Sequence, residues 1–228
     1  MIFTTFATKF VKTYKTNKHM KKLSLVTTFL LMGISCFAQT TKLPTPDMKR
    51  QTISVMETYK QRKSVREYSA KALSEQDLSD LLWAAQGQNR EDGHLTSPTA
   101  MNRQEIRLYV FTEKSVSLYD PQANTLTQVA SGDHRGIMAS GQDFVKNAPV
   151  VLLMVADMDK FRSNNQHAQW MVAVDTGIVC ENINLFCSAA GLCTVPRGTM
   201  DSKAISTLLG LNDNQIPLIN NPVGYPSK

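Results

Sequence analysis

The sequence predicts one domain of the α+β class, and three patterns predict it. Residues 149–156, PVVLLMVA, form an unbroken apolar run that is typical of a central strand buried on both faces. Residues 105–112, EIRLYVFT, alternate in polarity and indicate a second strand. Residues 167–190 form a long, mostly apolar segment that predicts a helix. Because such a helix is too apolar for the surface, it should be central or lie at a subunit interface. A chain of 228 residues without internal repeats has the length of one such domain.

Caps and turns predict the remaining elements. Ser74 and Asp77 form a capping box at the start of a helix that Gly87 ends. Turn-rich residues 120–124 connect two short runs and predict a β-hairpin. The other expected elements are a helix at 52–60, hairpin strands at 115–119 and 126–129, a strand at 192–197, a helix at 200–209 and a last strand at 216–220.

The first 38 residues predict an N-terminal extension that contains an export signal. Residues 20–22 are a short cationic start, and an apolar stretch with small residues near its end follows, which is typical of a secretory signal. This stretch is too short for a comfortable membrane span. We therefore expect Met20 as the initiator, cleavage after Ala38, and a periplasmic or otherwise exported protein. The alternatives are a lipid anchor on Cys36 and an uncleaved amphipathic anchor.

After the signal, residues 39–49 predict a linker and residues 50–228 the folded domain. Six lysines precede residue 39 without any acid, and they account for the whole net charge of +6. The folded part is therefore neutral overall, which argues against a nucleic-acid footprint. The glycine-rich nucleotide loops and the nucleophile elbow are absent from the sequence, which argues against the dehydrogenases and hydrolases that use them.

The cysteines and histidines do not form a recognisable metal or redox pattern. The four histidines are scattered and no C-x-x-C occurs, so we expect no metal site. Cys180 and Cys187 lie on one predicted helix, about 10 Å apart along its axis. That separation is too large for a disulfide, so we expect both as small buried apolar side chains rather than as a redox pair.

The first segment that could carry chemistry is Arg62-Lys63-Ser64-Val65-Arg66. In an extended chain alternate side chains share a face, so Arg62, Ser64 and Arg66 would point the same way. Guanidinium groups match the oxygens of a phosphate, which makes this face a candidate phosphate site. The alternative is a charged run that is simply solvated.

Two further segments combine groups that suit a flat heterocycle. Residues 97–105 carry a hydroxyl and primary amides, which offer a donor and an acceptor side by side. Residues 191–198 end in Gly198, where the backbone can approach a planar ligand closely. The alternatives are an ordinary polar loop with a helix cap and a strand-to-helix turn.

Taken in this order, the three segments resemble the nitroreductase family of FMN-dependent oxidoreductases. Residues 62–66 resemble its R-x-S-x-R/K signature, and residues 98–104 its P-S-[SA]-x-N-x-Q segment with Thr for Ser. Residues 195–198 resemble its flavin-facing loop, and residues 223–226 its terminal V-G-Y-P. Three short motifs are similar to those of the SagB/thiazole-oxidase-like dehydrogenases, namely Leu82-Trp83-Ala84-Ala85, Asn89-Arg90 and Gln104-Glu105.

The resemblance implies a mixed, mainly antiparallel sheet flanked by helices, and a homodimer with FMN at the subunit interface. Arg62 and Ser64 would hold the phosphate and ribityl chain, with Lys63 beside them, and Arg66 would lie near N1 and the C2 carbonyl of the flavin. The partner subunit would contribute a set of loop residues, namely Pro98, Thr99, Ala100, Asn102 and Gln104.

The same resemblance implies that Pro196, Arg197 and Gly198 line the ring, with a backbone N–H near N5. Gln142 is a further candidate for the pocket, and Lys228 stands where the family carries a longer basic tail. The implied reaction moves hydride through flavin N5 to a small organic acceptor such as a nitroaromatic or a quinone, and no side chain acts as catalytic acid or nucleophile. The alternatives are an azoline peptide dehydrogenase and a non-catalytic flavin-binding envelope protein.

Overall fold

A computed structural model describes residues 39–227 of the chain. The predicted export signal and Lys228 lie outside the described residues. None of the helices formed by residues 39–227 has the length and apolar character that crossing a membrane requires.

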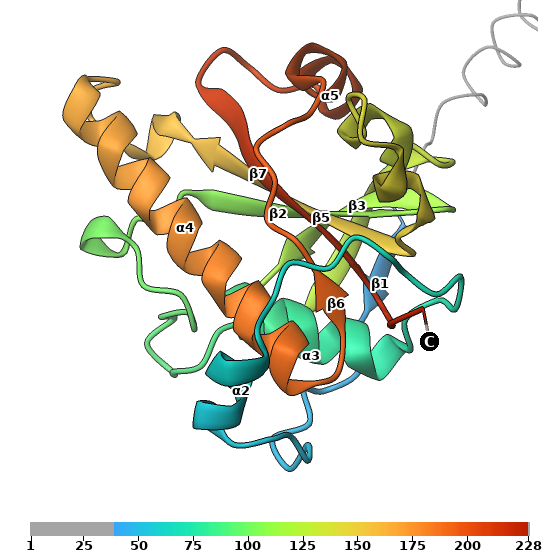
Figure 1. Cartoon of the computed structure of the whole chain (residues 1–228). Helices are drawn as coiled ribbons and strands as arrows, with labels where there is room; N and C mark the ends of the chain where they lie inside the picture. The colour runs from blue at the N-terminus through green and yellow to red at the C-terminus, as the bar shows by residue number, and fades with distance from the viewer. Residues whose placement is uncertain (1–38, 228) are drawn as a thin grey trace, which may run out of the picture. The chain divides into compact units, whose positions relative to one another are not determined.

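The centre of the domain is a seven-stranded sheet with the order β1-β4-β3-β2-β5-β7-β6 (Figure 1). Every strand pairing in this sheet is antiparallel. The strands are β1 (Thr40–Lys42), β2 (Ile106–Thr112), β3 (Ser115–Asp120), β4 (Thr125–Ser131), β5 (Val150–Asp157), β6 (Cys193–Thr194) and β7 (Gln215–Gly224).

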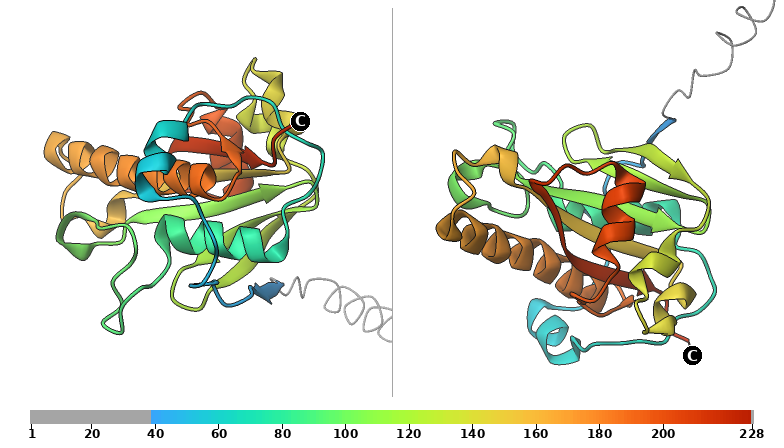
Figure 2. Two further views of the ribbon diagram at one scale, coloured as in Figure 1. Left: turned by 60° about the horizontal axis from the view of Figure 1, so that its bottom comes forward. Right: turned by 90° about the horizontal axis from the view of Figure 1, so that it is seen from above.

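Helices cover both faces of this sheet. They are α2 (Val55–Gln61), α3 (Glu75–Gln86), α4 (Gln166–Ala189) and α5 (Ser202–Leu209). One core cluster joins side chains of α3 and α4 to one face of β2 and β5. A second cluster joins Ile205 of α5, together with Met138 and Val145, to the opposite face. The two views of Figure 2 show α3 and α4 on one side of the strands and α5 on the other.

Strand β5 confirms the central buried strand expected from its apolar run. Leu152, Leu153 and Met154 are completely buried. Leu152 and Met154 belong to the cluster beneath α3 and α4, whereas Leu153 belongs to the cluster beneath α5. A strand with apolar layers on both faces has no polar side, which explains why its sequence does not alternate.

Side-chain caps set the helix boundaries. The Ser74 hydroxyl accepts a hydrogen bond from Asp77 N, and Gly87 is the C-cap, so α3 is confirmed with its expected ends. The helix expected at 52–60 begins later, at Val55, because Ser54 caps it by accepting from Glu57 N. The helix expected at 200–209 begins at Ser202 because Asp201 accepts from Ala204 N.

The two last strands differ from expectation. The strand expected at 192–197 is limited to Cys193–Thr194, since Pro196 lacks the N–H that a longer ladder would need. The strand expected at 216–220 runs from Gln215 to Gly224 although it contains prolines. Pairing with β5 from Gln215 to Val223, with one register shift, supports this strand. On its other edge, β6 pairs only with Val223 and Gly224, which leaves room there for residues without an N–H.

The segment expected as a linker contributes to the fold. Residues Thr40–Lys42 pair with β4 as the edge strand β1. Further along, the Pro44 carbonyl accepts from Ser79 Oγ at 2.5 Å, and Asp47 N donates to Asp80 Oδ1 at 2.8 Å. Residues 39–49 are therefore anchored to the sheet edge and to α3.

Candidate functional site

The predicted ligand-binding segments lie at two different places along α4. We call residues 62–66 the basic segment and residues 97–105 the polar loop. Val65 N of the basic segment donates to the Thr194 carbonyl of β6, at 2.9 Å. Ala100 N of the polar loop donates to Asp175 Oδ2, midway along α4, at 2.7 Å. Figure 1 shows the chain after α2 at one end of α4 and the loop before β2 beside its other half.

The rise of α4 gives the separation of these two anchors. Asp175 and Cys187, which lines the same hollow as Lys63 and Val65 of the basic segment, are twelve residues apart on α4. At 1.5 Å per residue this is roughly 18 Å. The basic segment and the polar loop of one chain are therefore two separate half-sites.

The basic segment presents its charges to solvent. Arg62, Lys63, Ser64 and Arg66 are exposed, while Val65 is half-buried against β6. None of the ion pairs formed among residues 39–227 includes the three cations. Exposed cations without carboxylate partners next to a hydroxyl suit an anion such as a phosphate.

Tyr68 anchors the basic segment from below. Its hydroxyl donates to the Val65 carbonyl at 2.9 Å, and its backbone bridges to Pro226 near the C-terminus. Burial raises the pKa of Tyr68 well above its usual range, although the charges of Arg197 and Arg66 act in the opposite direction. The phenol therefore stays neutral and serves as a hydrogen-bond donor.

Cys180 and Cys187 are buried free thiols, as expected, and Cys193 is a third one. Burial raises the pKa of Cys180 to about 11 and also raises the pKa of Cys187 and Cys193. The charge of Lys63 partly offsets this effect at Cys193. These thiols are therefore protonated apolar fillers rather than nucleophiles.

The turn at residues 196–198 presents backbone rather than charge. Pro196 and Gly198 are exposed, whereas Arg197 is buried. Arg197 N donates to the Asn220 carbonyl at 2.9 Å, and no acceptor among the described residues receives the Gly198 N–H. If this turn faces a flat ligand, Pro196 and the Gly198 N–H would meet it.

The guanidinium of Arg197 points into the protein and binds neutral acceptors. Its Nε donates to Gln142 Oε1 at 3.0 Å, and its Nη atoms donate to the carbonyls of Met138 and Ala139 and to Asn220 Oδ1. Burial lowers the pKa of Arg197. Arg197 and Gln142, both expected at the flavin, thus bind each other through their side chains.

A hollow of about 240 Å³ opens beside the basic segment, with Lys63, Gly191 and Cys193 in its lining. Complete small-molecule sites typically measure about 300–1,000 Å³. This hollow is therefore smaller than a complete site, which agrees with a half-site.

The amides and hydroxyls of the polar loop bind one another. Thr99 Oγ1 accepts from Gln104 N at 2.9 Å. Gln104 Nε2 donates to the Gly93 carbonyl at 2.8 Å and to Asn102 Oδ1 at 3.1 Å. This network holds the two ends of the loop together, while Asp175 of α4 anchors the loop at Ala100 N.

The polar loop also concentrates backbone strain and unpaired polar atoms. Met101, Asn102 and Gln104 have positive φ angles of 57°, 51° and 51°. Ser97, Arg103 and Glu105 of this loop carry buried side-chain polar atoms that have no hydrogen-bond partner within residues 39–227. Such features persist where the surroundings enforce them and cluster at functional sites.

Two buried acids beneath the polar loop were missed as site residues by the sequence analysis. Glu105 and Asp175 are both buried, and burial together with a hydrogen bond to Asp175 raises the pKa of Glu105 to about 7. Asp175 is an acid within an otherwise mostly apolar helix, which is the signal that could have indicated it. No cluster of three potential metal-ligating side chains occurs in the described part of the chain.

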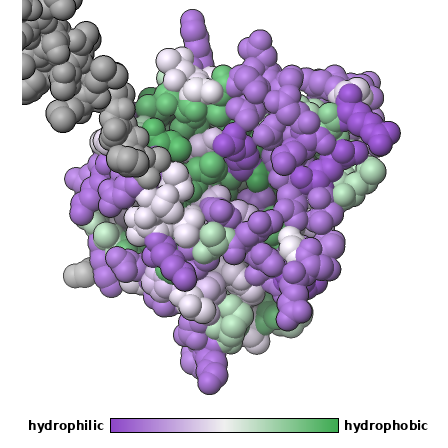
Figure 3. All heavy atoms as spheres, turned by 180° about the vertical axis from the view of Figure 1, so that it is seen from behind, coloured by the Kyte–Doolittle hydropathy of each residue, from purple (hydrophilic) through white to green (hydrophobic). Residues whose placement is uncertain are grey.

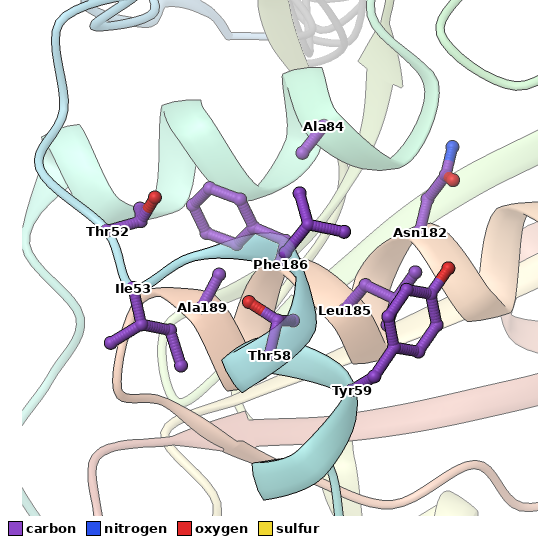
Figure 4. A pocket seen from close by; sticks show the side chains of 10 residues that line it. Thr52, Ile53, Thr58, Tyr59, Ala84, Asn182, Leu185, Phe186 and Ala189 are labelled. Carbon is purple, nitrogen blue, oxygen red and sulfur yellow. The ribbon is translucent and has the colours of Figure 1, made fainter.

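A second hollow, of about 310 Å³, lies between α2, α3 and α4 (Figure 4). Ile53, Tyr59, Leu185 and Phe186 give it a mainly apolar lining. It contains none of the predicted ligand-binding residues, so it is not the candidate site.

The structure is thus an α+β domain whose two candidate half-sites lie at separate points along α4. The nitroreductase family model matches residues 59–225, and the chain belongs to this family of oxidoreductases. The α+β fold implied by the resemblance is thereby confirmed, and a solved structure supports it directly. A crystal structure described as a nitroreductase of Ralstonia eutropha JMP134 is 30% identical, with a TM-score of 0.77 over 86% of this chain and 93% of that chain.

Two further proteins extend the comparison. A protein of Methanocaldococcus jannaschii named as a nitroreductase is 28% identical over 195 residues, which cover 81% of this chain and 96% of the relative. The NADPH:FMN oxidoreductase of Vibrio harveyi, solved with NAD⁺, shares the fold at 19% identity, with a TM-score of 0.60 over 76% of this chain and 69% of that chain.

Proposed function

We propose that the protein is an FMN-dependent oxidoreductase whose flavin lies between the basic segment of one subunit and the polar loop of its partner. Membership of the nitroreductase family carries this proposal. The fold neighbour from Vibrio harveyi is itself named as an NADPH:FMN oxidoreductase. The residues present suit the cofactor, because three exposed cations without ion-pair partners and a hydroxyl form a phosphate-binding face.

The candidate site residues have binding or orienting roles in this proposal. Arg62 and Ser64 hold the phosphate and the ribityl chain, and Arg66 stabilises negative charge near N1 of the ring. Gly198 offers its N–H to the ring edge. FMN itself supplies hydride transfer through N5, so the protein needs no catalytic acid or nucleophile.

The separate half-sites and the exposed apolar surface support the contribution of a second copy. One chain keeps its basic segment and polar loop roughly 18 Å apart along α4. Trp170 and Val174 of α4 are 60% and 42% exposed, and Val55, Met56 and Tyr59 of α2 are also exposed. Large exposed apolar side chains on two neighbouring helices favour a protein–protein contact. Figure 3, in contrast, shows a face that is mainly hydrophilic with one apolar area near its upper edge.

The acceptor is a small organic molecule such as a nitroaromatic or a quinone, and the protein is exported. An azoline peptide dehydrogenase and a non-catalytic flavin binder are the competing functions. Purified protein should be yellow, lose its colour with dithionite and regain it with a quinone or nitroaromatic. Reoxidation by none of a broad acceptor panel would favour the binder, and oxidation of an azoline peptide would favour the dehydrogenase.

The phosphate role is tested by Arg62→Ala. Losing one charged hydrogen bond costs about 1.5–3 kcal/mol, so FMN affinity should fall about 10- to 150-fold. Lys60→Ala is the matched control, because Lys60 is an exposed cation two residues earlier that pairs with Glu57. Equal FMN affinity in the two variants would contradict the assignment.

The subunit contribution is tested by Val174→Asp. A charge within the exposed apolar surface of α4 should yield monomers by light scattering, and the monomers should lose FMN. Glu181→Gln, on an exposed position of the same helix, serves as the control. A monomeric variant that keeps its FMN would show that one chain suffices.

A further inference from the structure

Two buried carboxylic acids, Glu105 and Asp175, lie at the polar loop and interact with each other, and the proposed function does not use them. Glu105 immediately precedes β2 and is fully buried, and Asp175 of α4 is 4% exposed. Asp175 holds the polar loop directly, because its Oδ2 accepts from Ala100 N at 2.7 Å. The pair therefore lies where the loop is anchored to the helix.

The surroundings of the pair do not support two negative charges. Neither oxygen of Glu105 has a hydrogen-bond donor among residues 39–227. Neither acid belongs to an ion pair formed by these residues. The positions one turn away from Asp175 on α4 are apolar, namely Met171, Val172, Ile178 and Val179. Burying an ionised carboxylate without donors or a cation is costly, so one proton should remain on the pair.

Neighbouring cations are engaged elsewhere. Arg103 of the polar loop lowers the pKa of Glu105, but its guanidinium donates to the Lys160 carbonyl at 2.9 Å and lies over Phe161. Arg107 of β2 lies over the ring of Tyr109. Neither charge therefore neutralises the pair.

The other titratable groups near Glu105 do not supply a positive charge. His94, beside the Gly93 that binds Gln104, pairs with Asp92. Asp157 of β5 adds a further carboxylate, and its backbone N donates to the Glu105 carbonyl at 2.9 Å. Arg103 and the backbone of Glu105 itself favour the ionised form of Glu105, but burial and Asp175 outweigh them and keep its pKa raised.

We propose that Glu105 and Asp175 share one proton and act as positioning residues for the polar loop. Protonated Glu105 donates to Asp175, and Asp175 keeps its other oxygen for Ala100 N. The inference rests on the proposed function only in that the loop would face the flavin. Removing the proton leaves two adjacent buried carboxylates, which repel each other and weaken the anchor of a loop that holds three residues at positive φ.

The loop should therefore loosen as the pH rises through the range in which the pair loses its proton. Burial, followed by the hydrogen bond to Asp175, raises the pKa of Glu105 to about 7. In the purified full-length protein, the protection of the Ala100 amide against hydrogen exchange should fall by up to about tenfold per pH unit between the ordinary pKa of 4.5 and this raised value, and level off above it, after correction for the intrinsic rate. Glu105→Gln keeps a donor for Asp175 but cannot ionise, so its protection should not change with pH.

Controls separate this effect from general loosening. Glu181→Gln, an exposed acid of α4, should behave like the wild type. A wild-type protection factor independent of pH, or a Glu105→Gln variant as pH-dependent as the wild type, would overturn the proposal. If Glu105→Gln fails to fold, infrared spectra of the wild type decide. A protonated carboxyl band should persist above about pH 5, where exposed acids are ionised, and its absence would also overturn the proposal.

The exchange experiment does not depend on the flavin. A wild-type chain whose loop depends on pH but which binds no FMN would contradict the proposed function and support the shared proton. A chain that binds FMN but whose loop does not respond to pH would contradict the shared proton and support the proposed function. The two proposals therefore fail by different observations.

Discussion

The backbones of Arg197 and Asn220 exchange two hydrogen bonds, and the Arg197 guanidinium folds back onto the same partner. Arg197 N donates to the Asn220 carbonyl at 2.9 Å, and Asn220 N donates to the Arg197 carbonyl at 2.8 Å. Arg197 Nη1 lies 2.7 Å from Asn220 Oδ1, and both residues are buried. This pairing fixes the turn at residues 196–198 to the edge of β7.

Replacing Arg197 by Met should destabilise the domain although the shape is nearly kept. The carbonyls of Met138 and Ala139 and the Asn220 amide would lose their donors, and one unsatisfied buried group alone costs about 1–3 kcal/mol. Urea unfolding should show a lower midpoint with an unchanged slope. Arg66→Met, which removes an exposed cation, is the control and should leave the midpoint unchanged. A variant of Arg197 as stable as the wild type would show that the buried guanidinium contributes no net stability.

A pair of glycine substitutions separates close packing from helix propensity. A Cβ on Gly224 would lie 2.8 Å from Pro149 Cδ and 3.2 Å from Tyr68 Cβ, so Gly224→Ala should cost about 1–3 kcal/mol through overpacking. A Cβ on Gly177, within α4, meets nothing within 4 Å. Gly177→Ala should therefore stabilise the isolated chain by about 0.5–1 kcal/mol. Thermal unfolding of both variants checks the opposite signs, and a Gly224→Ala protein with a raised midpoint would contradict the packing argument.

Local chemistry explains what the sequence could predict. A capping serine and a terminal glycine define α3 because their hydrogen bonds are made within one turn. The apolar run of β5 is equally local. The positions of β1 and the full length of β7 depend on which strand lies beside them, and no pattern within those residues records the partner.

The candidate site also has parts that the sequence predicts and parts that depend on distant residues. The basic segment could be predicted because its alternating cations are adjacent in the sequence. The inward direction of Arg197 depends on the carbonyls of Met138 and Ala139, more than fifty residues away. The contact of Glu105 with Asp175 likewise joins a strand to a distant helix, and in sequence Glu105 resembles any polar residue before a strand.

The free energy of unfolding should depend on pH in the direction expected for a buried acid with a raised pKa. Burial and the hydrogen bond to Asp175 raise the pKa of Glu105 from 4.5 to about 7, so the folded chain keeps a proton that the unfolded chain has lost within this window. The free energy of unfolding should therefore fall as the pH rises through the window, by at most about 1.4 kcal/mol per unit, and level off above it. Urea midpoints measured across the window should show this slope in the wild type and not in Glu105→Gln.

Asp77 provides a control of opposite sign. Although burial acts to raise its pKa, hydrogen bonds from Tyr225, Arg50 and Ser74 hold it below its usual value. Its stabilisation is present above the unfolded pKa and is lost as the pH falls through the lower folded pKa, so Asp77→Asn should alter the acid limb of the profile. Because the two windows do not overlap, Asp77→Asn should leave the slope near neutral pH intact. If the slope near neutral pH disappears in Asp77→Asn and remains in Glu105→Gln, the slope does not come from Glu105. That result would contradict the proposal of a shared proton.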